Sequence, residues 1–290
     1  MNARRNARSL SAREVLRLTL IGLVTVAYAF PVLWVILTAF KERVDIFAIP
    51  PKLVFDPTWD NFVRVFVRVT SEGGEEGTNF ARYFLNSVVL SFGSVALALV
   101  IGTMGAYSVS RYRFKNADFV MFSILSTRML PAVAAVIPIY LFFRKLHLMD
   151  SYVGMILLYT AFNLPFVIWM MRSFFDEIPR EIEEAALVDG SSRFRAFYKV
   201  ALPQVKSGIA ATVVISLLFT WNEFLFALML TGQKTRTVPV ALARTLQGER
   251  GVDWGVLAAI ETLYILPVLA VALLLQKYLL RGLTFGTVRR

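Results

Sequence analysis

The sequence predicts an all-α, polytopic membrane protein with six transmembrane helices. Of its 290 residues, 57% are hydrophobic and only 18% are charged. The mean hydropathy of +0.62 is higher than soluble domains usually show. The apolar residues gather in separate windows of roughly 20 residues or more, the length that crosses the hydrocarbon core of a bilayer. The charged segments between them would be costly to bury in hydrocarbon and therefore mark the two aqueous sides.

Six apolar windows follow one another along the chain. They lie at residues 18–40, 84–110, 119–143, 152–171, 208–232 and 256–280. They divide the chain into a basic N-terminal segment at 1–17, a first helix with a long outer loop at 18–83, a core of five helices at 84–280 and a C-terminal segment at 281–290. The first window has full spanning length and so predicts an uncleaved helix, although a signal-peptide-like run of arginines precedes it: Arg4, Arg5, Arg8, Arg13 and Arg17.

The basic residues indicate how the helices are oriented. With the N-terminus inside, the inner segments hold 18 Lys and Arg residues, and the outer segments hold 12 that are offset by ten acidic residues. Because cytoplasmic segments of membrane proteins carry an excess of basic residues, both termini are predicted to be cytoplasmic. Orientation and anionic lipid also account for the formal net charge of +11, so no nucleic-acid partner is needed.

Several kinds of chemistry are excluded by what the sequence lacks. It has no cysteine, which rules out disulfides, thiolate metal sites and a cysteine nucleophile. Its single histidine, His147, is expected in a solvated loop and not at a metal. No phosphate-binding P-loop, zinc-protease spacing or nucleophile elbow occurs. We therefore expect no catalytic residue, metal or cofactor on this chain.

The polar segment at residues 172–207 predicts two short helices at a sharp turn. Pro179 suits the first turn of a helix that starts with acidic residues, and Gly190 can adopt the left-handed conformation that ends it. Ser192 can cap a second helix, which Pro203 would break. Four apolar residues would share one face of this helix: Phe194, Phe197, Tyr198 and Ala201. On these grounds alone, an amphipathic loop resting on the membrane surface explains the segment equally well.

The same segment carries a family pattern. Its residues are Glu184, Ala185, Ala186, Asp189, Gly190, Leu202 and Pro203. They closely resemble the EAA signature of permease subunits of bacterial ATP-binding-cassette importers, in the spacing of the maltose-type, carbohydrate-importing branch. The resemblance implies the type I importer permease fold, with 172–207 as a coupling loop whose first helix docks in a groove of a separate ATPase. Small alanines permit close approach there, and the carboxylates can meet basic groups of the partner.

Other segments resemble the same family. Residues 83–87 look like the start of the permease core and residues 106–114 like its second-span exit. The run Trp221-Asn222-Glu223-Phe224 and the ending at 281–284 are similar to motifs of sugar permeases. The departures are small, since Ser191 replaces a commoner alanine and Phe285 replaces a small residue. The second departure puts the C-terminal contact in doubt.

The resemblance implies a set of partners. The chain would pair with a homologous second permease, two copies of a cytoplasmic ATPase that bind ATP and magnesium, and a periplasmic or lipid-anchored solute-binding protein. It would move a sugar across the bacterial inner membrane by alternating access and perform no covalent chemistry itself. A permease for polyamines or another small solute is the alternative within this class. An ion-coupled secondary transporter is disfavoured because the two halves of the chain show no internal repeat, and a structural protein would not need a coupling loop.

Polar residues within the windows are candidates for the translocation pathway. Arg128, Glu223 and Glu261 lie at membrane depth, where each charge costs at least about 2.5–3.5 kcal/mol. They could form an internal ion pair that fixes packing, line the pathway, or do both. Sugars are bound by amide and carboxylate groups beside aromatic rings, which adds four candidates to the set: Tyr159, Asn163, Trp221 and Asn222.

Two further expectations concern local structure. Pro131, Pro138 and Asn163-Leu164-Pro165 are expected to interrupt helices, as a cavity wall or as simple packing kinks. The outer loop at 233–254 is expected to engage the solute-binding protein, as the corresponding loop of related permeases can.

Overall fold

The computed structural model describes residues 11–69, 75–112, 115–245 and 252–285. The chain divides into two compact units. The first unit is Met1–Thr78 with Val252–Leu263, and the second unit is Asn79–Gly251 with Tyr264–Arg290. Several residues used in the sequence analysis lie outside the described residues: Arg4, Arg5, Arg8, Arg113, Phe114 and, for their side chains, 281–285.

The first unit is helical apart from one short hairpin. Its elements are α1 (Ala12–Ala39), α2 (Arg43–Ile46), α3 (Asp60–Phe66), β1 (Val67–Val69), β2 (Glu75–Gly77) and the beginning of α14 (Trp254–Phe285). A reciprocal capping box starts α1, in which Ser11 Oγ accepts from the amide of Glu14 and Glu14 Oε2 accepts from the amide of Ser11. The two strands pair antiparallel and are the only departure from the predicted all-α fold in the described residues.

Polar groups hold the end of α1 in place. The side-chain amide of Asn61 in α3 is buried and donates to the carbonyls of Ala39 (2.9 Å) and Lys41 (2.8 Å). Lys41 is also buried: its ammonium donates to the carbonyl of Lys52 (2.6 Å) and lies 4.3 Å from the centre of the Trp34 ring. The described beginning of the long loop, residues 41–61, is therefore anchored on the end of α1.

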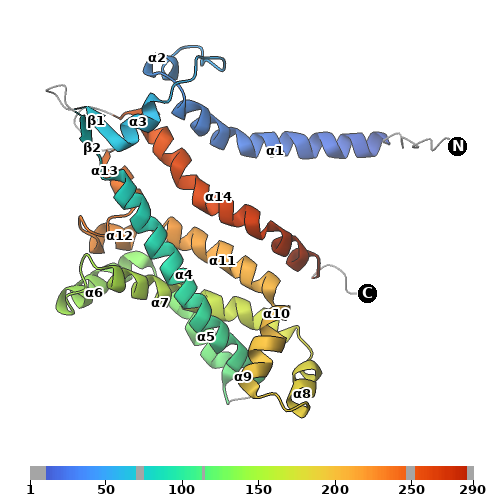
Figure 1. The fold of residues 1–290 in the computed structure, drawn as a ribbon. Coiled ribbons are helices and arrows are strands. Elements are labelled where there is room, and N and C mark those ends of the chain that lie inside the picture. The colour runs from blue at the N-terminus through green and yellow to red at the C-terminus, as the bar shows by residue number, and fades with distance from the viewer. Residues whose placement is uncertain (1–10, 70–74, 113–114, 246–251, 286–290) are drawn as a thin grey trace. The chain divides into compact units, whose positions relative to one another are not determined.

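The second unit contains the remaining helices (Figure 1). They are α4 (Phe80–Arg111), α5 (Ala117–Ser126), η1 (Thr127–Met129), α6 (Ala132–Lys145), α7 (Tyr152–Asp176), α8 (Arg180–Val188), α9 (Arg193–Ala196), η2 (Phe197–Ala201), α10 (Leu202–Gln204), α11 (Lys206–Trp221), α12 (Leu225–Leu230), α13 (Val238–Thr245) and the rest of α14. The element η2 is a π-helix.

The described helices supply four to six membrane spans. Four of them, α1, α4, α7 and α14, are long and apolar enough to cross a membrane, and six spans result if each of two bent helix pairs counts as one. Ala117–Met129 and Ala132–Lys145 meet at 91°, and Arg193–Gln204 and Lys206–Trp221 meet at 75°. The predicted window at 208–232 is likewise divided, because α11 ends at Trp221 and α12 begins at Leu225.

The three proline predictions have different outcomes. Pro131 interrupts the third span as expected and precedes α6, where its missing N–H is not needed. Pro138 and Pro165 lie inside α6 and α7, which continue through them, so the interruption predicted at these two positions is wrong. In membrane helices, neighbouring groups can satisfy the carbonyl that a proline leaves free.

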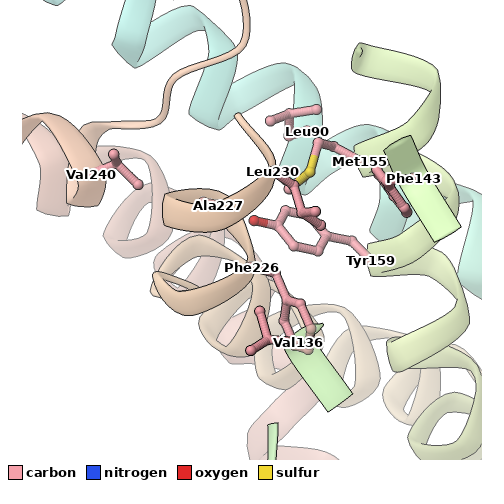
Figure 2. Close-up of a cluster of buried hydrophobic side chains, with 9 residues drawn as sticks. All are labelled: Leu90, Val136, Phe143, Met155, Tyr159, Phe226, Ala227, Leu230 and Val240. Atoms are coloured by element: carbon pink, nitrogen blue, oxygen red, sulfur yellow. The ribbon is translucent and has the colours of Figure 1, made fainter. Parts of the chain in front are cut away.

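The core of the second unit is built on α4, α7 and α11. The most extensive packing is between α4 and α7, where a Cβ on Gly102 would lie only 2.6 Å from Val167 Cγ1. Such small residues let two helix backbones approach closely. A separate apolar cluster joins α4, α6, α7, α12 and α13 (Figure 2) and comprises Leu90, Val136, Phe143, Met155, Tyr159, Phe226, Ala227, Leu230 and Val240.

Candidate functional site

The helix α8 and the turn that follows it form the centre of the predicted coupling segment. Pro179 directly precedes α8 and does not lie in its first turn. The predicted stop is confirmed, since Gly190 has a φ of +85°, a left-handed conformation that a glycine adopts at little cost. The amide of Ser191 then donates to the carbonyl of Ala186 (3.0 Å), which closes the end of the helix. The sharp turn expected from the sequence is present.

The second predicted helix differs from the expectation. Ser192 caps α9 as predicted, by accepting from the amide of Arg195 (3.3 Å). The apolar stripe is split: Phe197 and Ala201 are buried, whereas Phe194 and Tyr198 are 68% and 61% exposed. The reason is that the second unit supplies packing partners on one side only, where Phe197 meets the Tyr107 and Phe175 rings.

The predicted break at Pro203 is also displaced. Pro203 lies in the first turn of α10, where a proline needs no N–H, and the chain bends after Gln204.

The residues of the family pattern lie mostly on the surface of this segment. Glu184, Ala185, Asp189, Gly190 and Pro203 are exposed, and Ala186 and Leu202 are partly exposed. Beside them, Val188 is 87% exposed and Ile182 is 42% exposed. This surface therefore offers carboxylates, small residues and apolar side chains to a partner, and its own chain covers little of it.

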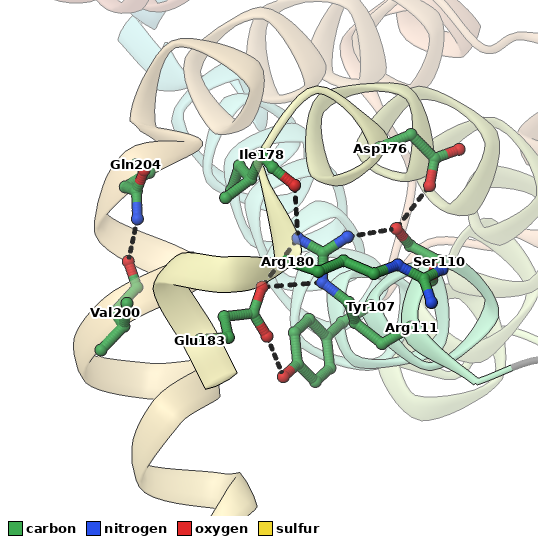
Figure 3. A network of polar contacts seen from close by, with 9 residues as sticks. All are labelled: Tyr107, Ser110, Arg111, Asp176, Ile178, Arg180, Glu183, Val200 and Gln204. Atoms are coloured by element: carbon green, nitrogen blue, oxygen red, sulfur yellow. Dashed lines mark hydrogen bonds and ion pairs between the residues drawn. The ribbon is translucent and has the colours of Figure 1, made fainter. Parts of the chain in front are cut away.

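Glu183, which precedes the family pattern, lies on the opposite side of α8. It is buried, and its carboxylate accepts from the hydroxyl of Tyr107 (2.5 Å) and from Nε of Arg111 (2.7 Å), as Figure 3 shows. Nη2 of Arg111 lies 2.7 Å from the same carboxylate, and both charged side chains of this ion pair are at most 10% exposed. Sequence analysis missed this residue. The available signal was the i, i+4 spacing of Tyr107 and Arg111, which places both on one face of α4.

The last turn of α4 makes further contacts with the connection between α7 and α8. Arg111 Nη2 donates to the carbonyl of Ile178 (3.2 Å), and Arg180 donates to the carbonyl of Ser110 (2.8 Å). The hydroxyl of Ser110 donates to the carboxylate of Asp176 and accepts from Arg111 Nη1 (3.0 Å). The end of α4, the end of α7 and the start of α8 therefore form one polar network (Figure 3).

Two of the candidate pathway residues, Tyr159 and Glu223, meet between α7 and the start of α12. The hydroxyl of Tyr159 donates to Glu223 Oε2 (2.7 Å), and the Glu223 carboxylate also accepts from the amides of Phe226 (2.8 Å) and Ala227 (3.0 Å) at the start of α12. Asn163, buried one turn along α7 from Tyr159, donates to the Thr220 hydroxyl (2.7 Å). Glu223 therefore caps α12 where the predicted fifth window is divided.

The neighbouring pair Trp221 and Asn222 has two different environments. Trp221 is buried, with its ring stacked on Tyr264 at 4.7 Å and its Nε1 donating to the Tyr264 carbonyl (3.1 Å). The hydroxyl of Tyr264 in turn donates to the Trp221 carbonyl. Asn222 is exposed, and within the described residues its side chain donates only to the carbonyl of Leu218 (2.9 Å). Trp221 is thus a packing residue in this structure, while Asn222 has an amide open to other contacts.

The structure does not pair the charges of Arg128 and Glu223. Arg128, in η1 beside the bend of the third span, donates to the carbonyl of Phe162 (3.3 Å), and its guanidinium lies 4.8 Å from the centre of the Phe219 ring. Glu223 uses its oxygens for Tyr159 and the backbone of α12, so no ion pair joins it to Arg128 in the described residues. The ion-pair alternative is therefore wrong for these two residues.

Glu261 belongs to the first unit of the chain, whereas the other six pathway candidates belong to the second. It borders a pocket of about 410 Å³ within that unit, lined also by Trp34, Thr38, Lys41 and Trp254. In the part of the chain that the structure describes, no group of three or more His, Cys, Asp and Glu side chains could hold a metal ion.

A second polar cluster holds the start of the loop at 233–254, and the sequence analysis missed its central residue. Asp150, in the turn before α7, accepts from the amides of Gly232 (2.8 Å), Lys234 (3.0 Å) and Thr235 (2.8 Å) and from the Thr235 hydroxyl (2.7 Å). Desolvation raises its pKa, but these hydrogen bonds outweigh that effect and lower the pKa of Asp150 to about 2.

The first turns of α4 hold the same loop from the other side. Asn86 is buried and donates to the carbonyls of Lys234 (3.0 Å) and Arg236 (2.8 Å), and the amide of Val238 donates to the Ser87 hydroxyl (3.0 Å). The motif expected to start the permease core is therefore a loop-binding element. The later part of the loop, at 246–251, lies outside the described residues.

Comparison with known proteins identifies the family. Residues 98–285 match the family described as "Binding-protein-dependent transport system inner membrane component". The chain belongs to this family of permeases. The permease is 37% identical over 262 residues to a probable ABC transporter permease protein of Sinorhizobium fredii, which covers 90% of this chain and 91% of that one. It is 32% identical over 282 residues to the trehalose/maltose transport system permease protein of Thermococcus litoralis, covering 95% and 98%.

The fold of the permease also has a solved counterpart. It resembles a chain in the crystal structure of a bacterial ABC transporter involved in the import of the acidic polysaccharide alginate, with a TM-score of 0.74, 22% identity and coverage of 93% of this chain and 99% of that chain. The predicted type I importer permease fold is therefore confirmed.

Proposed function

We propose that this permease is the membrane subunit of an ATP-driven, binding-protein-dependent sugar importer. The observation that carries the proposal is the α8 turn, whose Glu184, Ala185 and Asp189 are exposed in the spacing of the coupling signature. The substrate class rests on similarity to a permease named for trehalose and maltose over nearly the whole of both chains. ATP and magnesium would be bound by the partner ATPase, and this chain would perform no covalent chemistry.

The partner set follows from the same surface. An ATPase subunit would dock on α8, where Ala185 permits close approach, Val188 offers an apolar contact and the carboxylates of Glu184 and Asp189 meet basic groups. A homologous second permease, a second ATPase copy and a periplasmic or lipid-anchored solute-binding protein would complete the transporter.

The proposed orientation places both termini and residues 172–207 in the cytoplasm of a bacterium, with the loop at 233–254 on the outer side. Its support is the excess of Lys and Arg on the terminal side. The chain has no native cysteine, so a single cysteine at Ser191 can be labelled without background. A membrane-impermeant maleimide should label it only after the cells are opened, and labelling in intact cells would contradict the orientation.

The proposed translocation pathway uses the seven polar and aromatic candidates named from the sequence: Arg128, Tyr159, Asn163, Trp221, Asn222, Glu223 and Glu261. The exposed amide of Asn222 is the best placed of them for a sugar hydroxyl, whereas Tyr159, Asn163 and Trp221 act through packing and through the cap on α12. Alternating access would then change how these side chains are exposed to either side.

The test is reconstitution of the complete transporter in liposomes. The permease would be co-expressed with its partner permease, ATPase and binding protein, and ATP hydrolysis and uptake would be measured with trehalose, maltose and putrescine. We expect a sugar together with the binding protein to stimulate both activities. Stimulation by putrescine alone would refute the sugar assignment, and uptake driven by an ion gradient without ATP would refute the transporter class.

Docking on α8 is tested separately by co-purification. Reversing the charge of the exposed carboxylate with Glu184→Lys should reduce recovery of the ATPase with the permease. Membrane insertion should be kept, because the changed residue is exposed on a short helix outside the apolar spans. If α8 instead rested on the membrane surface, the added lysine would strengthen adhesion to anionic lipid and leave co-purification unchanged.

A further inference from the structure

We propose that Glu183 is a positioning residue that transmits movement of α8 to α4, separate from the exposed Glu184 beside it. This inference rests on the proposed function, because it concerns how an ATPase docked on α8 would move the permease. Successive residues of a helix point about 100° apart, so two adjacent glutamates can serve two different surfaces. Here one glutamate is exposed, whereas the other is 5% exposed and bound inside its own chain.

Several independent hydrogen bonds link α8 to the end of α4. Tyr107 and Arg111 bind the Glu183 carboxylate from two successive turns of α4, at 2.5 Å and 2.7 Å. Arg180, at the start of α8, returns a hydrogen bond to the carbonyl of Ser110 (2.8 Å). Links at residues 180 and 183 fix both the position of α8 along its axis and its rotation about that axis.

Without the pair of Glu183 and Arg111, α8 would be held by its chain connections and by apolar contact. The chain connects α8 to α7 through a short segment and to α9 through the turn at Gly190. This glycine has a φ of +85° and open space around it. Apolar contact is concentrated on Phe197, whose ring lies 4.7 Å from Tyr107 and belongs to the element after the turn. The buried pair of Glu183 and Arg111 is thus the principal polar tie between α8 itself and the spanning helices in the described residues.

The other end of α4 contacts the loop at 233–254. It is one helix of 32 residues, and Asn86 near its start binds the carbonyls of Lys234 and Arg236. Asn86 and Arg111 are separated by a rise of about 37 Å at 1.5 Å per residue. If α4 moves as one body, a displacement applied at Arg111 would reach the described start of the loop, at residues 233–238, through this helix. We therefore expect α4 to connect α8 with that loop.

The experiment compares Glu183→Gln with the matched control Glu184→Gln in the reconstituted transporter with binding protein and sugar. Each variant loses one carboxylate charge from the same helix. We expect Glu183→Gln to retain the ATPase on co-purification but to hydrolyse more ATP per sugar transported, by roughly 5-fold or more, the range of ordinary coupling free energies. Glu184→Gln should instead reduce recovery of the ATPase on co-purification, because it removes a carboxylate from the proposed docking surface.

The ratio is the decisive readout, because a merely structural defect would lower hydrolysis and transport together. An unchanged ratio in Glu183→Gln, or a loss of ATPase binding equal to that of the control, would overturn the inference. If Glu183→Gln fails to assemble, Tyr107→Phe is the deciding variant: it removes one hydrogen bond to Glu183 and keeps the ring contact, so its ratio should still rise, and a normal ratio would refute the role. Failure of the proposed function itself would look different, since the unmodified permease would then recover no ATPase.

Discussion

The hydrogen bonds of the Asp150 carboxylate predict how strongly the start of the loop at 233–254 is held in place. Replacing Asp150 with asparagine keeps the size of the side chain but removes the charge and turns an amide group toward backbone N–H donors. Asp150 accepts from three amides and one hydroxyl of the segment from Gly232 to Thr235. We therefore expect Asp150→Asn to release this segment locally while the helices on either side keep their packing.

The magnitude follows from the pKa of the carboxyl. Its fall from 3.8 to about 2 corresponds to about 2.4 kcal/mol, at 1.36 kcal/mol for each pKa unit. Asp150 is partly exposed, so solvent screening reduces the usable part to about 1 kcal/mol. The free energy lost in Asp150→Asn is therefore expected to lie between about 1 kcal/mol, with full screening, and about 2.4 kcal/mol, without screening. This range corresponds to roughly a 5-fold to 50-fold change in the local opening equilibrium.

Hydrogen exchange read by mass spectrometry measures that equilibrium directly. The peptide covering 231–238 should exchange roughly 5-fold to 50-fold faster in Asp150→Asn at neutral pH. Because the folded pKa is depressed, the stabilisation is complete above about pH 4 and is lost as the pH falls toward about 2. Protection of the unmodified protein, corrected for intrinsic exchange, should follow that curve, and protection of the variant should not.

A matched control separates the local effect from a general loss of charge. Asp118 is 92% exposed and pairs with Arg172 at 3.0 Å, so Asp118→Asn should leave exchange of the 231–238 peptide unchanged. Equal protection in the unmodified protein and in Asp150→Asn at pH 7 would refute the reasoning, as would an acceleration of the same size in Asp118→Asn.

Three other predictions follow from the geometry. Gly190→Val should strain a backbone at φ +85° by about 1–2 kcal/mol and reduce ATPase co-purification, whereas Gly190→Asn should be tolerated; equal recovery of both would contradict the turn assignment. Gly102→Ala should overpack against Val167, destabilise the protein by about 1–3 kcal/mol and so lower its thermal unfolding midpoint in detergent. Gly22→Ala should leave the midpoint unchanged, because Gly22 has open space around it. Glu223→Gln should weaken the cap on α12 by about 1 kcal/mol and slow sugar uptake without loss of ATPase recovery; normal uptake would remove this residue from the pathway.

The elements that the sequence predicts well are those whose signals are local. The length of the apolar windows predicts the spans, and Gly190 after an acidic helix predicts the turn. Both signals are local, because hydrophobicity and backbone flexibility act over a few residues. Pro131 predicts the interruption of the third span but not its 91° angle, since packing of the surrounding helices decides how far a broken helix turns. The same limit explains why α6 and α7 continue through their prolines.

The residues that sequence reasoning missed have partners far away in the chain. Glu183 binds α4 about seventy residues upstream, and Asp150 binds a loop about eighty residues downstream. A single sequence shows each as an ordinary charged residue of a polar segment. The predicted stripe of Phe194, Phe197, Tyr198 and Ala201 failed for a related reason: periodicity groups apolar residues but cannot say which of them find packing partners, and only Phe197 and Ala201 are buried.

The bend of the third span constrains its surroundings. Pro131 has no N–H, and the amide of Leu130 reaches only the Thr127 carbonyl, at 3.4 Å, so this corner falls short of the regular helical ladder. Acyl chains cannot satisfy a backbone oxygen that lacks an internal partner, because hydrocarbon offers no donors. Where this corner lies at the depth of the acyl chains, water or another protein surface is therefore expected to cover it and the neighbouring guanidinium of Arg128.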